Sequence, residues 1–134
     1  MGLIRRRTTE GGQDRWPEVE LRVYGGDDGP RGTKQILLGP DDGAPHFAVR
    51  VFQIPPGQSS NDEAHPHDHG VFVMRGRARV LLGDALHDVG PGDLVWVAPD
   101  ERHRIDSLGP DTLQFLCVVP SWGEVDAASR PPAP

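Results

Sequence analysis

The sequence predicts an all-β fold, a sandwich or small barrel built from short strands. Glycine and proline punctuate the chain, with 17 Gly and 14 Pro among 134 residues, which favours strands joined by tight turns over long helices. Short apolar runs recur throughout, and no window of helical length keeps a helical apolar period without a Gly or Pro break. The length is that of one domain, so we expect a single all-β unit.

The predicted strands follow one another along the chain, and each ends at a turn signal. Val19, Leu21 and Val23 alternate with charged residues, which is typical of a half-buried strand over 19–24. The stretch GGDDGPRG (25–32) is expected to form a loop, and Gly83-Asp84 predicts the turn of a hairpin. The other strands are expected at 34–39, 46–54, 69–74, 77–83, 85–90, 94–99, within 100–112 and at 113–120.

The ends of the chain differ in composition from its centre. Residues 1–18 are polar and are expected to form a loose N-terminal arm, residues 19–126 the barrel, and residues 127–134 a disordered tail. The net charge of −6 and the absence of a basic stripe argue against nucleic acid as a partner. No apolar stretch is long enough for a membrane span, and a signal-peptide core is missing, so we expect a cytoplasmic protein.

Three of the six histidines lie in the stretch EAHPHDHGVFVMRG (63–76). If this segment is extended, Glu63, His65, His67 and His69 project to one side, because alternate residues of a strand share a face. Imidazole and carboxylate groups are the usual ligands of Fe, Zn, Mn, Ni and Cu, and His103 could add another from elsewhere. The simpler alternative is a polar strand end with exposed imidazoles.

The spacing of these residues resembles that of the small single-domain cupins, which are jelly-roll β-barrels. The family's first motif is G(x)5HxH(x)3–4E(x)6G, and Gly57, Glu63, His65, His69 and Gly76 fall on its positions, with Glu and His exchanged. Its second motif, G(x)5PxG(x)2H(x)3N, is matched at Pro99 and His103, after a turn at 91–93. The resemblance covers about residues 46–120 and implies a single cupin barrel.

By this resemblance the metal ligands are Glu63, His65, His69 and His103. Glu63 and His67 are then the candidates for a catalytic acid or base near the metal. A second ligand set, His65, His67 and His103 with His69 outside, stays open. His46 and His87 each stand alone and are expected to be surface residues.

The resemblance implies one divalent transition metal per chain, with Fe(II) favoured and Ni, Mn, Cu or Zn as alternatives. The function it favours is a metal-dependent oxidoreductase of dioxygenase type that acts on a small organic molecule and O₂. The alternatives are a redox-neutral isomerase, lyase or cyclase, and a small-ligand-binding barrel without catalysis. Members of the family are often homodimers, and a homodimer is expected here.

Several inward-facing residues are candidates for the pocket wall, although packing in the core would explain each of them equally well. They are Val71, Val73, Phe52 or Ile54, Trp96, Phe115 and Cys117. Arg50 is the candidate cation for a substrate carboxylate, with an exposed strand arginine as the alternative. We expect the apolar face that carries Phe72 and Met74 to be covered by the N-terminal segment or by a second subunit.

Overall fold

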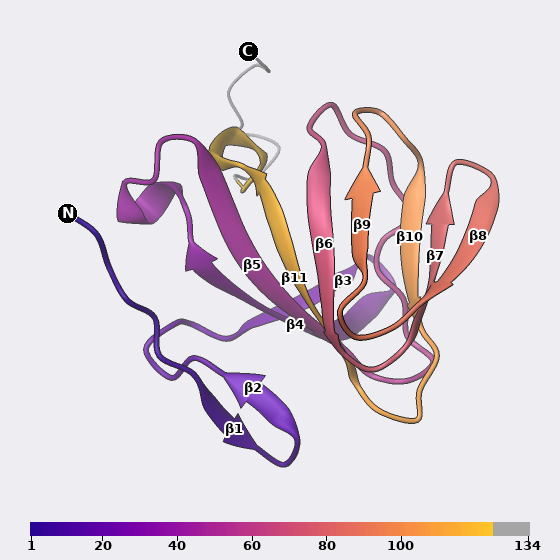
Figure 1. Cartoon of the computed structure of the whole chain (residues 1–134), viewed down its shortest axis with the longest axis horizontal. Helices are drawn as coiled ribbons and strands as arrows, with labels where there is room; N and C mark the ends of the chain where they lie inside the picture. The colour runs from indigo at the N-terminus through magenta and orange to yellow at the C-terminus, as the bar shows by residue number, and fades with distance from the viewer. Residues whose placement is uncertain (125–134) are drawn as a thin grey trace.

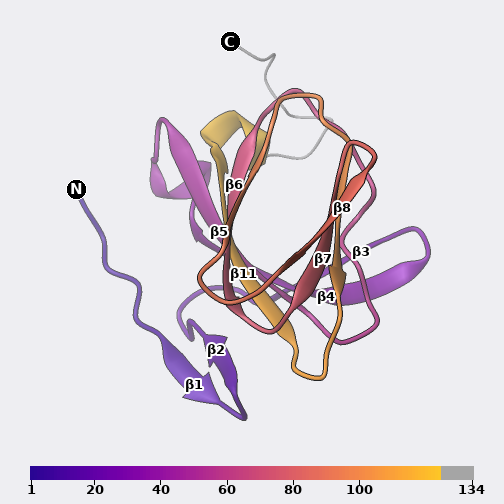
Figure 2. The ribbon, with the colours of Figure 1, turned by 45° about the vertical axis from the view of Figure 1, so that its right-hand side comes forward.

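The computed structural model describes residues 1–124, and these form a barrel of two facing antiparallel sheets (Figures 1 and 2). The larger sheet has the strand order β3 (Arg22–Gly26), β4 (Gly29–Leu38), β5 (Phe47–Ile54), β11 (Leu113–Pro120), β6 (His69–Arg75) and β9 (Leu94–Val97). The smaller sheet has the order β10 (His103–Ser107), β7 (Ala78–Leu82) and β8 (Ala85–Val89). The all-β jelly-roll prediction is therefore confirmed.

Alternating burial along the strands defines the interior of the barrel. On β6, Val71 and Val73 are buried, whereas Phe72 between them is exposed, as expected for a strand with one face in the core. Burial of such aliphatic side chains contributes on the order of 1.5–3 kcal/mol each. The interior of the barrel is filled by one apolar cluster, which comprises Ala48, Phe52, Ile54, Val71, Val73, Ala78, Val80, Val95, Val97, Ile105, Leu113, Phe115, Cys117 and Val119.

The N-terminal segment is ordered, and the prediction of a loose arm over residues 1–18 is wrong for its second half. β1 (Thr8–Glu10) and β2 (Gln13–Arg15) form a hairpin beside the barrel (Figure 1). Trp16 is buried with Leu37 and Val51 in a second apolar cluster, against which Met74 packs. The N-terminal segment thus shields the Met74 side of the sheet. The predicted C-terminal tail at 127–134, like the last two residues predicted for the barrel, lies outside the described residues.

The stretch 25–32 is part of a long hairpin and not the predicted loop. β3 pairs with β4 from Arg22 to Gly26, with a bulge after Tyr24. Gly32 has the Gln53 carbonyl at the place where a side chain would begin, so the close approach of β4 to β5 needs a glycine here. Glycine and proline in this stretch predicted a loop because both are rare in ordinary strands.

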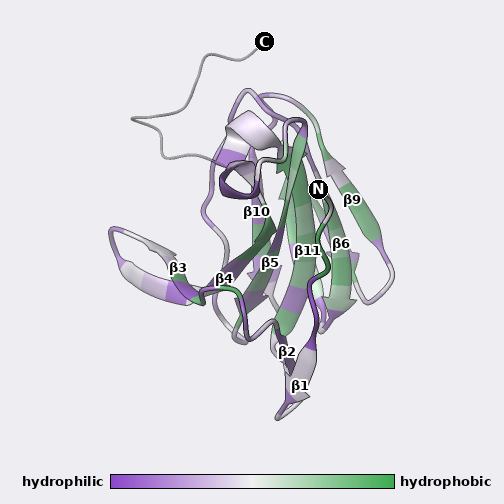
Figure 3. Cartoon of the chain, turned by 90° about the vertical axis from the view of Figure 1, so that its left-hand side faces the viewer, coloured by the Kyte–Doolittle hydropathy of each residue, from purple (hydrophilic) through white to green (hydrophobic). Residues whose placement is uncertain are grey.

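The outer face of the large sheet carries exposed apolar side chains. Hydrophobic residues concentrate along β11, β6 and β9 (Figure 3), and Phe72, Leu94 and Trp96 are among the exposed ones. The predicted homodimer would cover such a face, and it stays a prediction. Within residues 1–124, none of the helices has the length and apolar character needed to cross a membrane.

Candidate metal site

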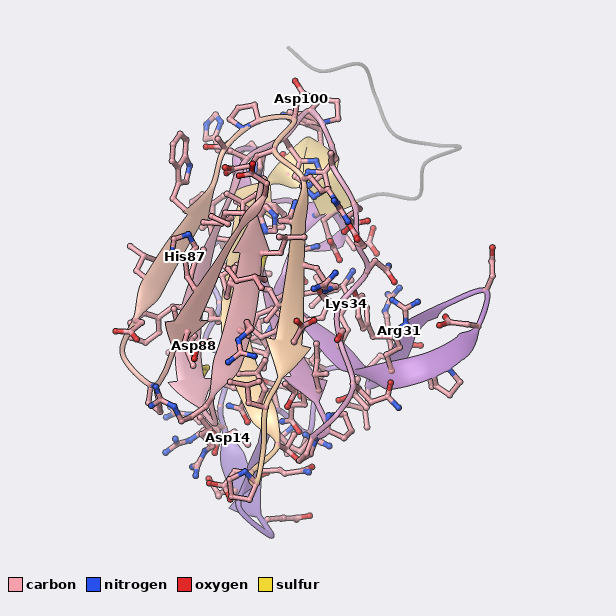
Figure 4. All side chains as sticks on the ribbon, turned by 90° about the vertical axis from the view of Figure 1, so that its right-hand side faces the viewer. Asp14, Arg31, Lys34, His87, Asp88 and Asp100 are labelled. Atoms are coloured by element: carbon pink, nitrogen blue, oxygen red, sulfur yellow. The ribbon has the colours of Figure 1, made fainter. Side chains whose placement is uncertain are left out.

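Three histidines from separate segments converge at one end of the barrel. His69 begins β6 on the large sheet, His103 begins β10 on the small sheet, and His65 lies in the loop before β6. Each offers a nitrogen, and the three atoms all lie within 4.8 Å of one another. The Nε2 atoms of His69 and His103 are 3.2 Å apart. Asp100 marks the same end in Figure 4, and its main-chain N–H donates to the carbonyl of His65 at 2.8 Å.

The loop that presents His65 is bent, so the expected extended segment from Glu63 to His69 is not formed. The chain bends at Pro66 and His67, and the strand begins only at His69. The bend lets Nδ1 of His65 reach the carbonyl of His67, 2.8 Å away. It also stacks the two imidazole rings, whose centroids are 3.8 Å apart with an angle of 6° between the planes. Convergence therefore arises from a loop and two sheets rather than from one strand face.

Hydrogen bonds to the outer ring nitrogens orient all three imidazoles. Nδ1 of His65 faces the His67 carbonyl, and Nδ1 of His103 faces the Glu101 carbonyl at 2.8 Å. Because a carbonyl only accepts, both Nδ1 atoms are assigned as donors, which places the acceptor lone pair of each ring on Nε2. Nδ1 of His69 lies 3.1 Å from Sγ of Cys117. With the proton of His69 on Nδ1, its acceptor lone pair is likewise on Nε2. A donor set of this kind fits a divalent transition metal.

Burial keeps the central histidine neutral. It lowers the pKa of His69 to about 2, and the neighbouring His103 and His65 add to the effect. Burial likewise raises the pKa of the Cys117 thiol, although Arg50 opposes the shift. A neutral imidazole is the form that binds metals, so His69 needs no deprotonation at ordinary pH.

Glu63 and His67 lie at the edge of this cluster. The Glu63 carboxylate is 3.9 Å from Nε2 of His65 and its side chain is 46% exposed, and Glu63 is not in the group of three. Its main chain pairs with His103 through two hydrogen bonds, which fixes its place beside the site. His67 is buried against Trp122, with ring centroids 5.5 Å apart. The group of three includes His69 and not His67, which favours the first predicted ligand set over the alternative that left His69 outside.

A cavity of about 460 Å³ opens beside the histidines. Phe52, Phe115 and Cys117 line it as predicted, whereas Ile54, Val71 and Val73 are in the core and not on its wall. The prediction for Trp96 is wrong: it is 60% exposed on the outer face, because it alternates with the buried Val95 and Val97. The two solitary histidines, His46 and His87, are exposed, and Figure 4 shows His87 on β8, away from the cluster.

A group of three charged side chains also lines the cavity, Lys34, Arg50 and Glu124, and the sequence predicted a role for Arg50 alone among them. Arg50 is buried, not exposed, and its Nη1 donates to Glu124 of the turn η2 (Ser121–Glu124) at 2.6 Å. Lys34 on β4 contacts the other Glu124 oxygen, also at 2.6 Å. Lys34 and Glu124 had no distinguishing sequence pattern. Lys34 and Ile36 are two positions apart on β4, so both side chains lie on one face of the strand. This relation points Lys34 into the cavity only once the register of β4 is known.

The relatives of the chain agree with this architecture. It is 34% identical over 110 residues to the 1-methylthio-D-xylulose 5-phosphate methylsulfurylase of Rhodospirillum rubrum, which covers 80% of this chain and 69% of the relative. A cupin 2 conserved barrel domain protein from Rhodopseudomonas palustris superimposes with a TM-score of 0.74 and 31% identity, over 89% of this chain and 81% of that one. The polyketide cyclase RemF from Streptomyces resistomycificus gives a TM-score of 0.69 and 26% identity, over 87% and 78%.

The family model of the cupin domain matches residues 50–119, which run from β5 to the end of β11 and include all three converging histidines. The chain therefore belongs to the cupin domain family.

Proposed function

We propose that the chain is a metal-dependent cupin enzyme that acts on a small organic molecule in the cavity beside the three histidines. The observation that carries this proposal is the convergence of three Nε2 lone pairs from His65, His69 and His103 at the cavity wall. Three imidazoles would leave coordination positions open for a substrate group. When bound there, a divalent transition metal would supply a Lewis acid that polarises a substrate oxygen.

The neighbouring residues supply the other parts of an active site. Glu63 has a half-exposed carboxylate at the cavity, so it can accept a proton from a bound molecule and exchange it with solvent. His67 is the second candidate for this role, because its ring also lines the cavity. Phe52, Ile105 and Phe115 provide apolar wall that excludes water from the reacting group.

The reaction type we favour is redox-neutral, such as group transfer or cyclisation. The support comes from the relatives, since one is named a methylsulfurylase and another a polyketide cyclase, and neither name mentions oxygen. A dioxygenase-type oxidoreductase with Fe(II) is the second candidate, and the three-imidazole donor set favours it, because such sites bind redox-active metals.

Metal analysis of the untagged protein tests the proposal. We expect about one equivalent of a divalent transition metal per chain after reconstitution, lost in His69→Ala and His103→Ala. His87→Ala is the matched control, because that imidazole is exposed on β8, and it should keep the metal. A wild-type protein that binds no metal after reconstitution would overturn the proposal. Oxygen uptake during turnover by the loaded protein would favour the dioxygenase, and turnover without it the redox-neutral reaction.

A further inference from the structure

We propose that Lys34 and Arg50 form a binding subsite for an anionic group of the substrate, a carboxylate or a phosphate, which the Glu124 carboxylate occupies in the free protein. Both cations line the same cavity as the three histidines. The inference rests on the proposed function, because it names the class of substrate for that cavity. It adds a second anchoring point, separate from the histidines.

The strand register brings the two cations together. Lys34 pairs with Phe52 and Ile36 pairs with Arg50 across β4 and β5, so Lys34 and Arg50 are diagonal neighbours on one face. The Phe52 ring lies beneath both: the Lys34 nitrogen is 5.6 Å and the Arg50 guanidinium carbon 5.1 Å from its centroid. Figure 4 labels Lys34 beside β10, on the side of the β3–β4 hairpin. Two cations held over one aromatic ring form a rigid, preorganised anion site.

Glu124 is bound there as a substrate carboxylate would be. One of its oxygens contacts Lys34 and the other contacts Arg50, each at 2.6 Å, and its side chain is only 4% exposed. Although burial opposes ionisation, the charges of Arg50 and Lys34 hold the pKa of Glu124 below its usual value. The carboxylate thus shows where an anion binds and how it is held.

The subsite has more positive charge than Glu124 balances. Lys34 and Arg50 carry two charges against one carboxylate, and burial, together with the Arg50 charge, lowers the pKa of Lys34. Nε of Arg50 is buried and has no hydrogen-bond partner within residues 1–124. A buried donor without an acceptor costs about 1–3 kcal/mol, so an anion with more oxygens than Glu124 would be better bound.

Glu124 is held by a short turn and not by a strand. Ser121 anchors the turn η2, since its main-chain N–H donates to the His46 carbonyl and its hydroxyl to the Pro45 carbonyl. The turn lies beside the ends of β5 and β11, at the histidine end of the barrel (Figure 1), and Gly123 packs on the His67 ring. A four-residue turn of this kind can move away at less cost than a strand of the sheet. An incoming anion could therefore replace Glu124 without unfolding the barrel.

The subsite is close to the histidine cluster. A single thiol joins them, because Sγ of Cys117 lies 2.9 Å from Nη2 of Arg50 and 3.1 Å from Nδ1 of His69. A molecule that reaches both places has its anionic group only a few atoms from the group at the histidines. The substrate class is therefore a small, compact carboxylate or phosphate ester.

Anion binding to the full-length protein tests this inference. Isothermal titration with inorganic phosphate and with acetate, at pH 8, compares the wild type with Glu124→Gln. We expect Glu124→Gln to bind at least one of the two anions about tenfold more tightly, equivalent to about 1.4 kcal/mol. Glu10→Gln removes the same charge at an exposed site on β1, outside the cavity, and should bring no gain. Adding Lys34→Gln to Glu124→Gln should abolish the gain, and the anion with the larger gain identifies phosphate or carboxylate as the group recognised.

A gain in anion affinity no larger than that of Glu10→Gln, or one that survives Lys34→Gln, would overturn the inference. If Glu124→Gln does not fold, as judged by circular dichroism, phosphate and acetate titrations of the labelled wild type followed by NMR replace it: shifts at Lys34 and Glu124 support the subsite, and none overturns it. The titrations are run on metal-loaded and chelated protein. If the protein cannot be loaded with metal, the proposed metalloenzyme function fails. Tighter anion binding by Glu124→Gln in that metal-free protein would still support the subsite.

Discussion

Nδ1 of His69 lies 3.1 Å from Sγ of Cys117, and the same sulfur accepts a hydrogen bond from Nη2 of Arg50 at 2.9 Å. The thiol thus joins a ring at the centre of the histidine cluster to a buried cation. Because Sγ faces Nδ1, the Nε2 atom of His69 turns toward Nε2 of His103. Cys117 thus orients the central imidazole, and it is not in the group of three residues that could hold a metal.

Loss of the Cys117 sulfur should weaken metal binding without removing it. We expect Cys117→Ala to lower metal affinity about 10–100-fold, the usual effect of losing a group that orients a metal-binding histidine. Cys117→Ser should lose less, because its hydroxyl oxygen can still accept. Competition with a chromophoric chelator measures the affinities. Val118→Ala, on the other face of β11, is the control and should bind like the wild type. Equal affinities for Cys117→Ala and Val118→Ala would show that the contact does not orient His69.

Glu63 should act on the substrate and not hold the metal. Its carboxylate is half exposed and lies outside the group of three nitrogens, so Glu63→Gln should keep the metal and lose turnover about 10²–10⁴-fold, as for removal of a general base. Metal content by mass spectrometry and turnover on the same sample separate the two roles. Loss of metal from Glu63→Gln would instead make it the fourth ligand that the sequence motif suggests.

The strands around the site could be predicted from sequence because each has a simple signal. His69–Arg75 alternates buried and more exposed residues, and Leu113–Pro120 is apolar except for Gln114; both became strands where expected. The places of His69 and His103 in the cluster followed from motif spacing, since both begin strands whose register the barrel fixes.

Features that depend on distant contacts could not be predicted. Arg50 meets Glu124 across 74 positions of sequence, and nothing local to either residue indicates the pair. Trp16 and Asp14 lie in the polar segment that was predicted to be a loose arm, yet both are buried. At the bend after Pro66, His67 packs against Trp122, which comes from the other end of the described chain. In each case the contact joins residues far apart in the sequence, so no local pattern indicates it.

Gly76 should be required for stability, and Gly83 less so. Both have left-handed backbones, with φ of 79° and 64°, so any side chain costs about 1–2 kcal/mol in either place. At Gly76 a Cβ would also lie 2.9 Å from Cα of Leu113 and from the Thr112 carbonyl, whereas nothing lies within 4 Å at Gly83. Urea unfolding of Gly76→Ala and Gly83→Ala measures the difference. We expect Gly76→Ala to be the less stable of the two by at least about 1 kcal/mol, the usual cost of overpacking. Equal losses would mean that Leu113 moves aside freely.

Asp14 should make the stability of the fold sensitive to acid. Its buried carboxylate, at the end of the barrel opposite Asp100 in Figure 4, accepts hydrogen bonds from Arg75, Gln114 and Thr9. Burial raises the pKa of Asp14, but these hydrogen bonds outweigh it and hold the pKa below its usual value. Because the folded-state pKa is the lower one, the network stabilises the fold above the unfolded pKa of about 4, and this is lost as the pH falls through the folded value.

Asp14→Asn should therefore reduce the free energy of unfolding at pH 7 by about 1–3 kcal/mol, since its partners lose a charged acceptor. The difference from the wild type should narrow as the pH is lowered toward the folded-state pKa of Asp14, where the wild type loses the same charge. Urea unfolding at pH 7 and at several acidic pH values measures both effects. Asp88→Asn is the control: its pair with Arg79 is exposed, and solvent screens exposed pairs, so they add little to stability. A deficit for Asp14→Asn that stays constant with pH would mean that the packing of the side chain stabilises the hairpin, and that its charge does not.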